Sequence, residues 1–111
     1  NNMEFIDTEI DSMQIIMHAG NAKSNAYEAL IAVKGGDYVT GDAKMKSAKE
    51  EILIAHRAHA ELLRKLADAD HMRDVDLLMV HAEGHLSATA IAVDLIVELC
   101  NLHKKIEGVN E

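Results

Sequence analysis

Histidine is the residue type through which this chain could do chemistry. The sequence holds seven histidines, and His81 and His85 form the most informative pair. Residues four apart on an α-helix lie on the same face, so these two imidazoles are expected to be neighbours. Both interrupt a stripe of apolar positions, where a polar ring needs a hydrogen-bond partner. The pair therefore indicates polar chemistry set into an apolar helix face.

Three interpretations of this pair remain open on spacing alone. The rings could be hydrogen-bonded histidines of a core or an interface. They could supply two ligands to zinc, and His56 and His59 form another possible pair. They could instead serve phosphoryl transfer, because a neutral imidazole nitrogen can attack a phosphoryl group and hold it as a phosphoramidate. In that case His85 is well placed to donate a hydrogen bond to a group carried on His81.

Composition excludes several other classes. The sequence contains no glycine-rich phosphate loop, no Gly-x-Ser-x-Gly elbow and no cysteine pair. The formal net charge of −8 argues against nucleic-acid binding, which needs clustered Lys and Arg. No uninterrupted apolar run approaches the roughly 20 residues of a membrane span, and residues 1–4 lack the basic start of a signal peptide. The single Cys100 fits a reducing cytoplasm, and its place in an apolar stripe predicts a core position.

The elements that must position the histidines are helices. The chain has no proline, only six glycines and many strong helix formers, which predicts an all-α fold. Its 111 residues suit one domain over 1–111. Breaks at Gly35-Gly36-Asp37 and at 67–71 predict helices over 8–34, 39–66 and 73–107. Their expected caps are Asp7 or Thr8, then Thr40 or Asp42, with Gly108 as the final stop. Short connections make this an antiparallel up-down-up three-helix bundle.

The third helix carries more apolar surface than one bundle can cover. Its two stripes step by three and four residues and lie about 100° apart. One consists of Val75, Met79, Ala82, Leu86, Thr89, Val93, Ile96 and Cys100, and the other of Leu78, His81, His85, Ala88, Ala92, Leu95, Leu99, Leu102 and Ile106. Because a monomer needs to bury only one stripe, the second predicts a homo-oligomer around a symmetry axis.

Three segments resemble one known family. Residues 77–86, Leu-Leu-Met-Val-His-Ala-Glu-Gly-His-Leu, are similar to the active-site region of lactose/cellobiose-type IIA proteins of the bacterial phosphotransferase system. Residues 19–24, Ala-Gly-Asn-Ala-Lys-Ser, resemble that family's small-residue segment in the first helix. Gly36-Asp37-Tyr38 resembles its turn before the second helix. The resemblance runs from about residue 10 to residue 106.

This resemblance implies a cytoplasmic homotrimer that carries phosphate for sugar uptake. His81 matches the residue that receives a phosphoryl group from the histidine phosphocarrier protein, and a cysteine of the IIB component would accept the group next. Partner docking is expected on the helix surface around His81, including Met79 and Leu78 where these are exposed. The residue-based alternative is a non-enzymatic helical metal-binding or adaptor bundle, which zinc binding lost on His81→Ala and His85→Ala would indicate.

Position 84 departs from the family pattern. Gly84 stands where the family has an aspartate that resembles a ligand for a divalent cation such as Mg²⁺ on the trimer axis. Glycine offers no side-chain oxygen, and Glu83, which replaces a usual glutamine, lies about 100° further round the helix. We therefore expect no metal ligand here and no required cofactor.

Overall fold

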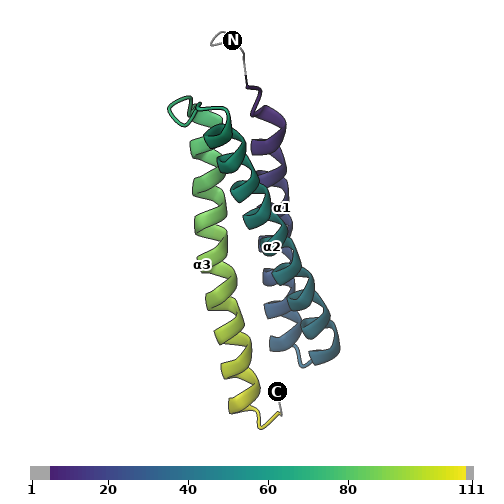
Figure 1. The fold of residues 1–111 in the computed structure, drawn as a ribbon. Coiled ribbons are helices and arrows are strands. Elements are labelled where there is room, and N and C mark those ends of the chain that lie inside the picture. Colours follow the sequence, from purple (N-terminus) through teal and green to yellow (C-terminus); the bar gives the residue numbers. More distant parts are fainter. Residues whose placement is uncertain (1–5, 110–111) are drawn as a thin grey trace.

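The computed structural model describes residues 6–109 and contains three helices. They are α1 (Glu9–Lys34), α2 (Tyr38–Asp68) and α3 (Leu77–Ile106). The helices run up, down and up as an elongated bundle with extents of 63 × 18 × 16 Å (Figure 1). No strand occurs within residues 6–109, so the predicted all-α three-helix bundle is confirmed. The expectation for residues 1–4 lies outside the described part of the chain.

The turn between α1 and α2 depends on Gly36 and Gly41. Gly36 has φ +84°, a conformation that favours glycine. A Cβ at Gly41 would lie 2.6 Å from a methyl group of Val33, so this glycine lets the two helices approach closely. The Asp37 carboxylate accepts a hydrogen bond from the Thr40 N–H at 3.1 Å and caps α2. The prediction of Thr40 or Asp42 as the cap was therefore wrong.

The start of α3 differs from the sequence prediction. The predicted start at Arg73 is wrong because residues 69–76 form the connection, with Asp70 in a left-handed conformation at φ 59°. Asp76 then caps α3 by accepting from the Met79 N–H at 2.9 Å. At the other end Gly108, with φ 75°, follows the last turn of α3 as predicted.

Small residues of α1 form the centre of the bundle. Its buried positions are Ser12, Ile15, Ala19, Ala22, Ala26, Ala29 and Val33. The large apolar residues Ile10, Met13, Met17, Tyr27 and Ile31 of this helix are exposed, whereas Val33 is buried. Alanine lets α1 pack closely against both other helices, so its buried face is recognised by small size and not by hydrophobic bulk.

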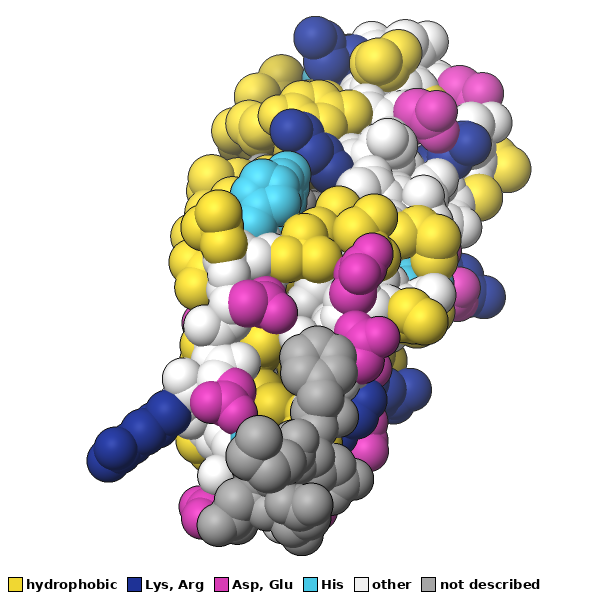
Figure 2. Space-filling model, turned by 90° about the horizontal axis from the view of Figure 1, so that it is seen from above, with side chains coloured by type: hydrophobic (Ala, Val, Ile, Leu, Met, Phe, Trp, Pro, Cys, Tyr) yellow, Lys and Arg dark blue, Asp and Glu magenta, His cyan; other side chains and the backbone are white. Residues whose placement is uncertain are grey.

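The two predicted apolar stripes of α3 differ in burial. Seven of the eight residues in the first are buried against α1 and α2, and Val75, which precedes the helix, is exposed. Leu95, Leu99, Leu102 and Ile106 of the second stripe are exposed. Figure 2 shows hydrophobic side chains at the surface, with histidine among them. The excess apolar surface inferred from the sequence is therefore present.

By length and composition alone, α3 could span a membrane. This helix was not predicted as a possible span from the sequence, because its apolar residues do not form one uninterrupted run. The structure offers another reason for its composition, because α3 carries one apolar face packed in the bundle and a second on the outside. A helix with apolar residues on two faces, only one of them packed in the bundle, can have the overall hydropathy of a membrane span.

Candidate functional site

One carboxylate fixes the end of the bundle nearest His81. Asp76 caps α3 through one oxygen, and its other oxygen accepts a hydrogen bond from the Thr8 hydroxyl at 3.0 Å. Thr8 immediately precedes α1 and is buried. The first turns of α1 and α3 are therefore tied together, which holds the helix position of His81 steady.

The structure brings His81 and His85 together as the spacing predicted. Their ring centroids lie 4.5 Å apart and their planes meet at 83°, so the edge of one ring faces the other. Both side chains are exposed. Exposure leaves the imidazole nitrogens accessible to a partner, which a buried core pair would not allow.

Apolar side chains border His81. Leu77, Leu78 and His81 line a shallow pocket of about 500 Å³ on the surface of α3. A partner protein seated there would exclude water from the ring and strengthen polar contacts to it. Of the two residues expected at the docking surface where exposed, Leu78 is partly exposed beside His81, whereas Met79 is buried in the core at 6 % exposure.

His85 faces a second hollow, between α1 and α3. This groove of about 570 Å³ is lined by Gly20, Lys23, Ser24, Tyr27, Glu28, His85 and Thr89. A Cβ at Gly20 would meet no atom within 4 Å, so that glycine leaves the groove open and does not mark a close helix contact. Lys23 and Ser24 were not predicted as site residues, although both lie in the small-residue segment that resembles the family.

The second histidine pair does not assemble into a metal site. His59 points from α2 to α3, where its Nε2 lies 3.6 Å from a carboxylate oxygen of Glu83. His56 is exposed elsewhere on α2. Within residues 6–109 no group of three or more His, Cys, Asp or Glu side chains could hold a metal ion.

Position 84 does not fit a divalent cation held by a carboxylate. Gly84 is exposed and open space surrounds the place of a Cβ, so this position presents no oxygen ligand. The neighbouring Glu83 carboxylate is directed to His59 and away from His81, as the helix geometry predicted. No chemical step at His81 is therefore derived through a metal.

Cys100 belongs to the core, as predicted. It is a free cysteine, buried at 6 % exposure, in the lower half of α3. Burial raises the pKa of its thiol, an effect that the positive charge of Lys104 partly opposes. The thiol lies 19 residues along α3 from His81, about 28 Å at 1.5 Å per residue. It takes no part in chemistry at the histidine pair.

Comparison with known proteins agrees with this geometry. Residues 11–104 match the family described as "PTS system, Lactose/Cellobiose specific IIA subunit". The chain belongs to this family. It is a sugar-specific IIA component of a phosphotransferase system.

Curated relatives and solved structures of the family are similar over most of their length. The lichenan-specific phosphotransferase enzyme IIA component of Bacillus subtilis is 39% identical over 93 residues, 84% of each chain. The N,N'-diacetylchitobiose-specific EIIA component of Escherichia coli K12 is 36% identical over 86% of this chain and 82% of its own. The cellobiose-specific enzyme IIA of Bacillus anthracis superposes with TM-score 0.83 at 32% identity, covering 99% of this chain and 100% of that one.

One solved relative includes a partner. A structure of the IIA(chitobiose)–HPr complex of the N,N'-diacetylchitobiose branch of the Escherichia coli phosphotransferase system has TM-score 0.80 and 34% identity to this chain. The superposition covers 93% of this IIA chain and 99% of the relative. The helical bundle described above is therefore shared with these solved relatives.

Proposed function

We propose that this IIA chain carries a phosphoryl group on His81. A ring nitrogen of His81 forms an N–P bond while the N–P bond of the phosphorylated histidine phosphocarrier protein breaks. The N–P bond on His81 then breaks as a cysteine sulfur of the IIB component forms an S–P bond. Each transfer exchanges one bond to phosphorus for another, so the phosphoryl group moves without any oxidant or reductant.

The observation that carries this proposal is the exposure of His81 beside His85. An accessible imidazole with apolar neighbours at a helix surface is suited to a reaction between two docked proteins. The sequence around it resembles the family's active-site region, and it lies inside the segment matched to the family. The similarity to an IIA chain solved with HPr supports the histidine phosphocarrier protein as the donor.

His85 is proposed as a donor to the phosphoryl oxygens. Its ring lies 4.5 Å from that of His81, centroid to centroid, and a ring N–H on His85 can be directed at an oxygen of the transferred group. Such a donor stabilises the negative charge without forming a bond to phosphorus. We expect His85→Ala to slow phosphorylation by about 10- to 100-fold and to leave the acceptor residue unchanged.

The exposed stripe of α3 supports a homotrimer, and the family resemblance is the basis for proposing that the trimer is cytoplasmic and built of single-domain chains over 1–111. Leu95, Leu99 and Ile106 are 60%, 49% and 72% exposed, which is unfavourable for an isolated chain in water. Three copies that meet along α3 would cover these residues. Because Gly84 adds no carboxylates near such an axis, we propose that no divalent cation is needed to offset like-charge repulsion.

The test is phosphorylation followed by intact-mass measurement. Wild type, His81→Ala and the matched control His56→Ala are incubated with phosphoenolpyruvate, enzyme I and the histidine phosphocarrier protein. His56 is an exposed histidine on α2, away from the pair. We expect one acid-labile phosphoryl group per chain on wild type and His56→Ala, and none on His81→Ala. An unphosphorylated wild type beside demonstrably active donor proteins would contradict the proposal and favour a helical adaptor or metal-binding bundle.

A further inference from the structure

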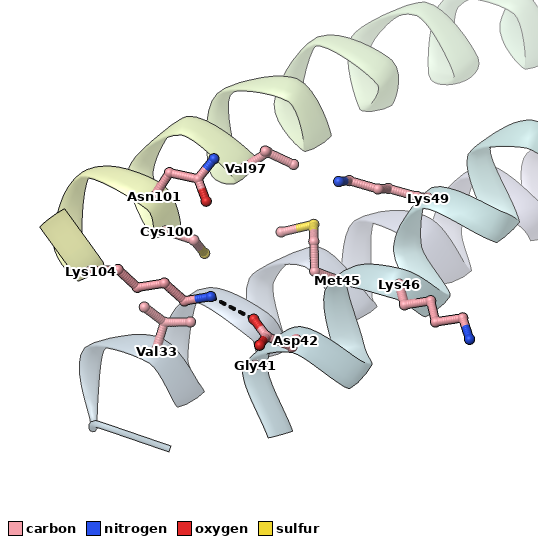
Figure 3. Close-up of a pocket in the computed structure, with 10 residues that line it drawn as sticks. All are labelled: Val33, Gly41, Asp42, Met45, Lys46, Lys49, Val97, Cys100, Asn101 and Lys104. Carbon is pink, nitrogen blue, oxygen red and sulfur yellow. Dashed lines mark hydrogen bonds and ion pairs between the residues drawn. The ribbon is translucent and has the colours of Figure 1, made fainter. Parts of the chain in front are cut away.

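A separate pocket, remote from His81 and from the groove at His85, lies between α2 and α3. It has a volume of about 310 Å³, near the lower end of the range for small-molecule sites. Its floor is apolar and includes Val33, Met45, Val97 and Cys100. Figure 3 shows Met45 and Cys100 facing the space between the two helices. A floor of this kind favours a ligand with an apolar body.

Three lysines and one carboxylate line this pocket, so its lining carries net positive charge. The side chains of Lys49 and Asn101 point into the space above Met45, whereas Lys46 turns away from it (Figure 3). Within residues 6–109, neither Lys49 nor Asn101 has a recorded ion-pair or hydrogen-bond partner. The chain as a whole carries −8, so a locally positive pocket is unusual on this protein.

Lys104 is the buried member of the group. It is only 7% exposed, and its ammonium donates to the Asp42 carboxylate at 2.6 Å (Figure 3). An ammonium has three N–H donors, and a buried charge is costly when its donors lack acceptors. Asp42 uses one donor, and the described residues provide no other recorded acceptor. An acceptor in the pocket would satisfy the remaining two.

The pocket is independent of the proposed trimer surface. On a helical wheel, Val97, Cys100 and Lys104 lie about 100–160° from the exposed stripe that contains Leu99. Copies that associate through Leu95, Leu99 and Leu102 would therefore leave this pocket open. It also lies about 25–35 Å along α3 from His81.

We propose that this pocket binds a small organic anion. Its carboxylate or phosphate head is held by Lys104, Lys49 and Asn101, and its body of a few carbon atoms lies against Met45 and Cys100. The site is separate from the phosphoryl-transfer reaction, so the proposal does not rest on His81. Two charge-assisted hydrogen bonds and a modest apolar contact suit millimolar or stronger binding.

The test is an NMR titration of the ¹⁵N-labelled full chain. Hexanoate and phenyl phosphate serve as probes with an apolar body, and acetate and inorganic phosphate carry the same heads without one. We expect saturable amide shifts confined to residues 41–49 and 97–104 with hexanoate, phenyl phosphate or both. The probe that binds more tightly identifies the preferred head group. Acetate and inorganic phosphate should bind at least about tenfold more weakly than the probe with the same head group.

Three variants separate the pocket from general charge effects. Lys104→Met and Lys49→Gln should each weaken binding by about tenfold, since each removes a charged donor. Lys105→Gln, an exposed neighbour outside the lining, should leave affinity unchanged. Lys49 is exposed, so its replacement tests binding without threatening the fold. Shifts that do not saturate, that spread over the surface, that saturate at the same ligand concentration in Lys49→Gln as in wild type, or that are equal with acetate would overturn the proposal.

Discussion

The two faces of α3 are built from similar residues and have opposite properties. On the inner face Met79, Leu86 and Ile96 are buried among α1 and α2. On the outer face Leu95 and Leu99 are exposed in line with the histidine pair. Each face also carries a potential nucleophile, a thiol inside and imidazoles outside. Burial makes the inner face a stabilising surface and keeps its thiol unreactive, whereas exposure leaves the outer face available to partners.

This difference explains why the same helix can hold the fold and do chemistry. A nucleophile for transfer between proteins must be reachable by two partners in turn, which only the outer face permits. Other chains can cover the apolar residues beside the histidines, whereas the apolar residues of the core are already covered within the bundle.

The largest expected effect is loss of association when the outer face is charged. Leu99→Asp places a carboxylate in the proposed interface, and burying an unpaired charge costs several kcal/mol. Leu53→Asp on α2 is the matched control, because Leu99 and Leu53 are 49% and 48% exposed. Sedimentation equilibrium should give about three times the 12.2 kDa chain mass for wild type and Leu53→Asp, and one chain mass for Leu99→Asp. A monomeric wild type, or equal dissociation of both variants, would contradict the proposal that the chains associate through the outer face of α3.

The next effect concerns the stability contributed by the inner face. Leu86 is 3% exposed in the core, so Leu86→Ala should lower the free energy of unfolding by about 2–5 kcal/mol. Leu53→Ala removes the same atoms from a half-exposed position and should cost less than about 1 kcal/mol. Urea unfolding at one protein concentration measures both. Similar losses in the two variants would show that burial in the bundle does not distinguish these positions.

The smallest effect is on the chemistry of the buried thiol. Since burial raises the pKa of Cys100 above its ordinary value of 9.0, folding favours the protonated thiol. Its contribution to stability is therefore fully present below pH 9 and is lost as the pH rises through the higher folded-state pKa. Alkylation by iodoacetamide between pH 7 and 10 should be at least about tenfold slower in the native chain than in urea. Equal rates would place the thiol at the surface.

Sequence reasoning succeeded where periodicity carries the information. The two stripes of α3 and the adjacency of His81 and His85 follow from helical spacing. The buried face of α1 does not follow from a pattern of bulky apolar residues, because this face is mostly alanine. The start of α3 was missed because it depends on the side chain of Asp76, which also accepts a hydrogen bond from distant Thr8.

The other residues around the histidine pair could not be predicted from helical spacing. Lys23 and Ser24 line the same groove between α1 and α3 as His85. Which residues line that groove depends on how the two helices are rotated against each other. The same holds for the pocket in which Lys104 of α3 reaches Asp42 of α2. Residue types alone do not fix these rotations, since many pairings of apolar stripes are compatible with one sequence.

The most direct test of the central claim is to observe the ring nitrogens of all seven histidines during phosphorylation. Long-range ¹H–¹⁵N NMR of the ¹⁵N-labelled chain, treated with the phosphorylated histidine phosphocarrier protein, reports each imidazole without any mutation. The account predicts that one ring nitrogen of His81 shifts to a phosphoramidate value. The neighbouring His85 should change only slightly, and the other five should stay where they were. A phosphoramidate signal on any other histidine, or none at full donor activity, would contradict it.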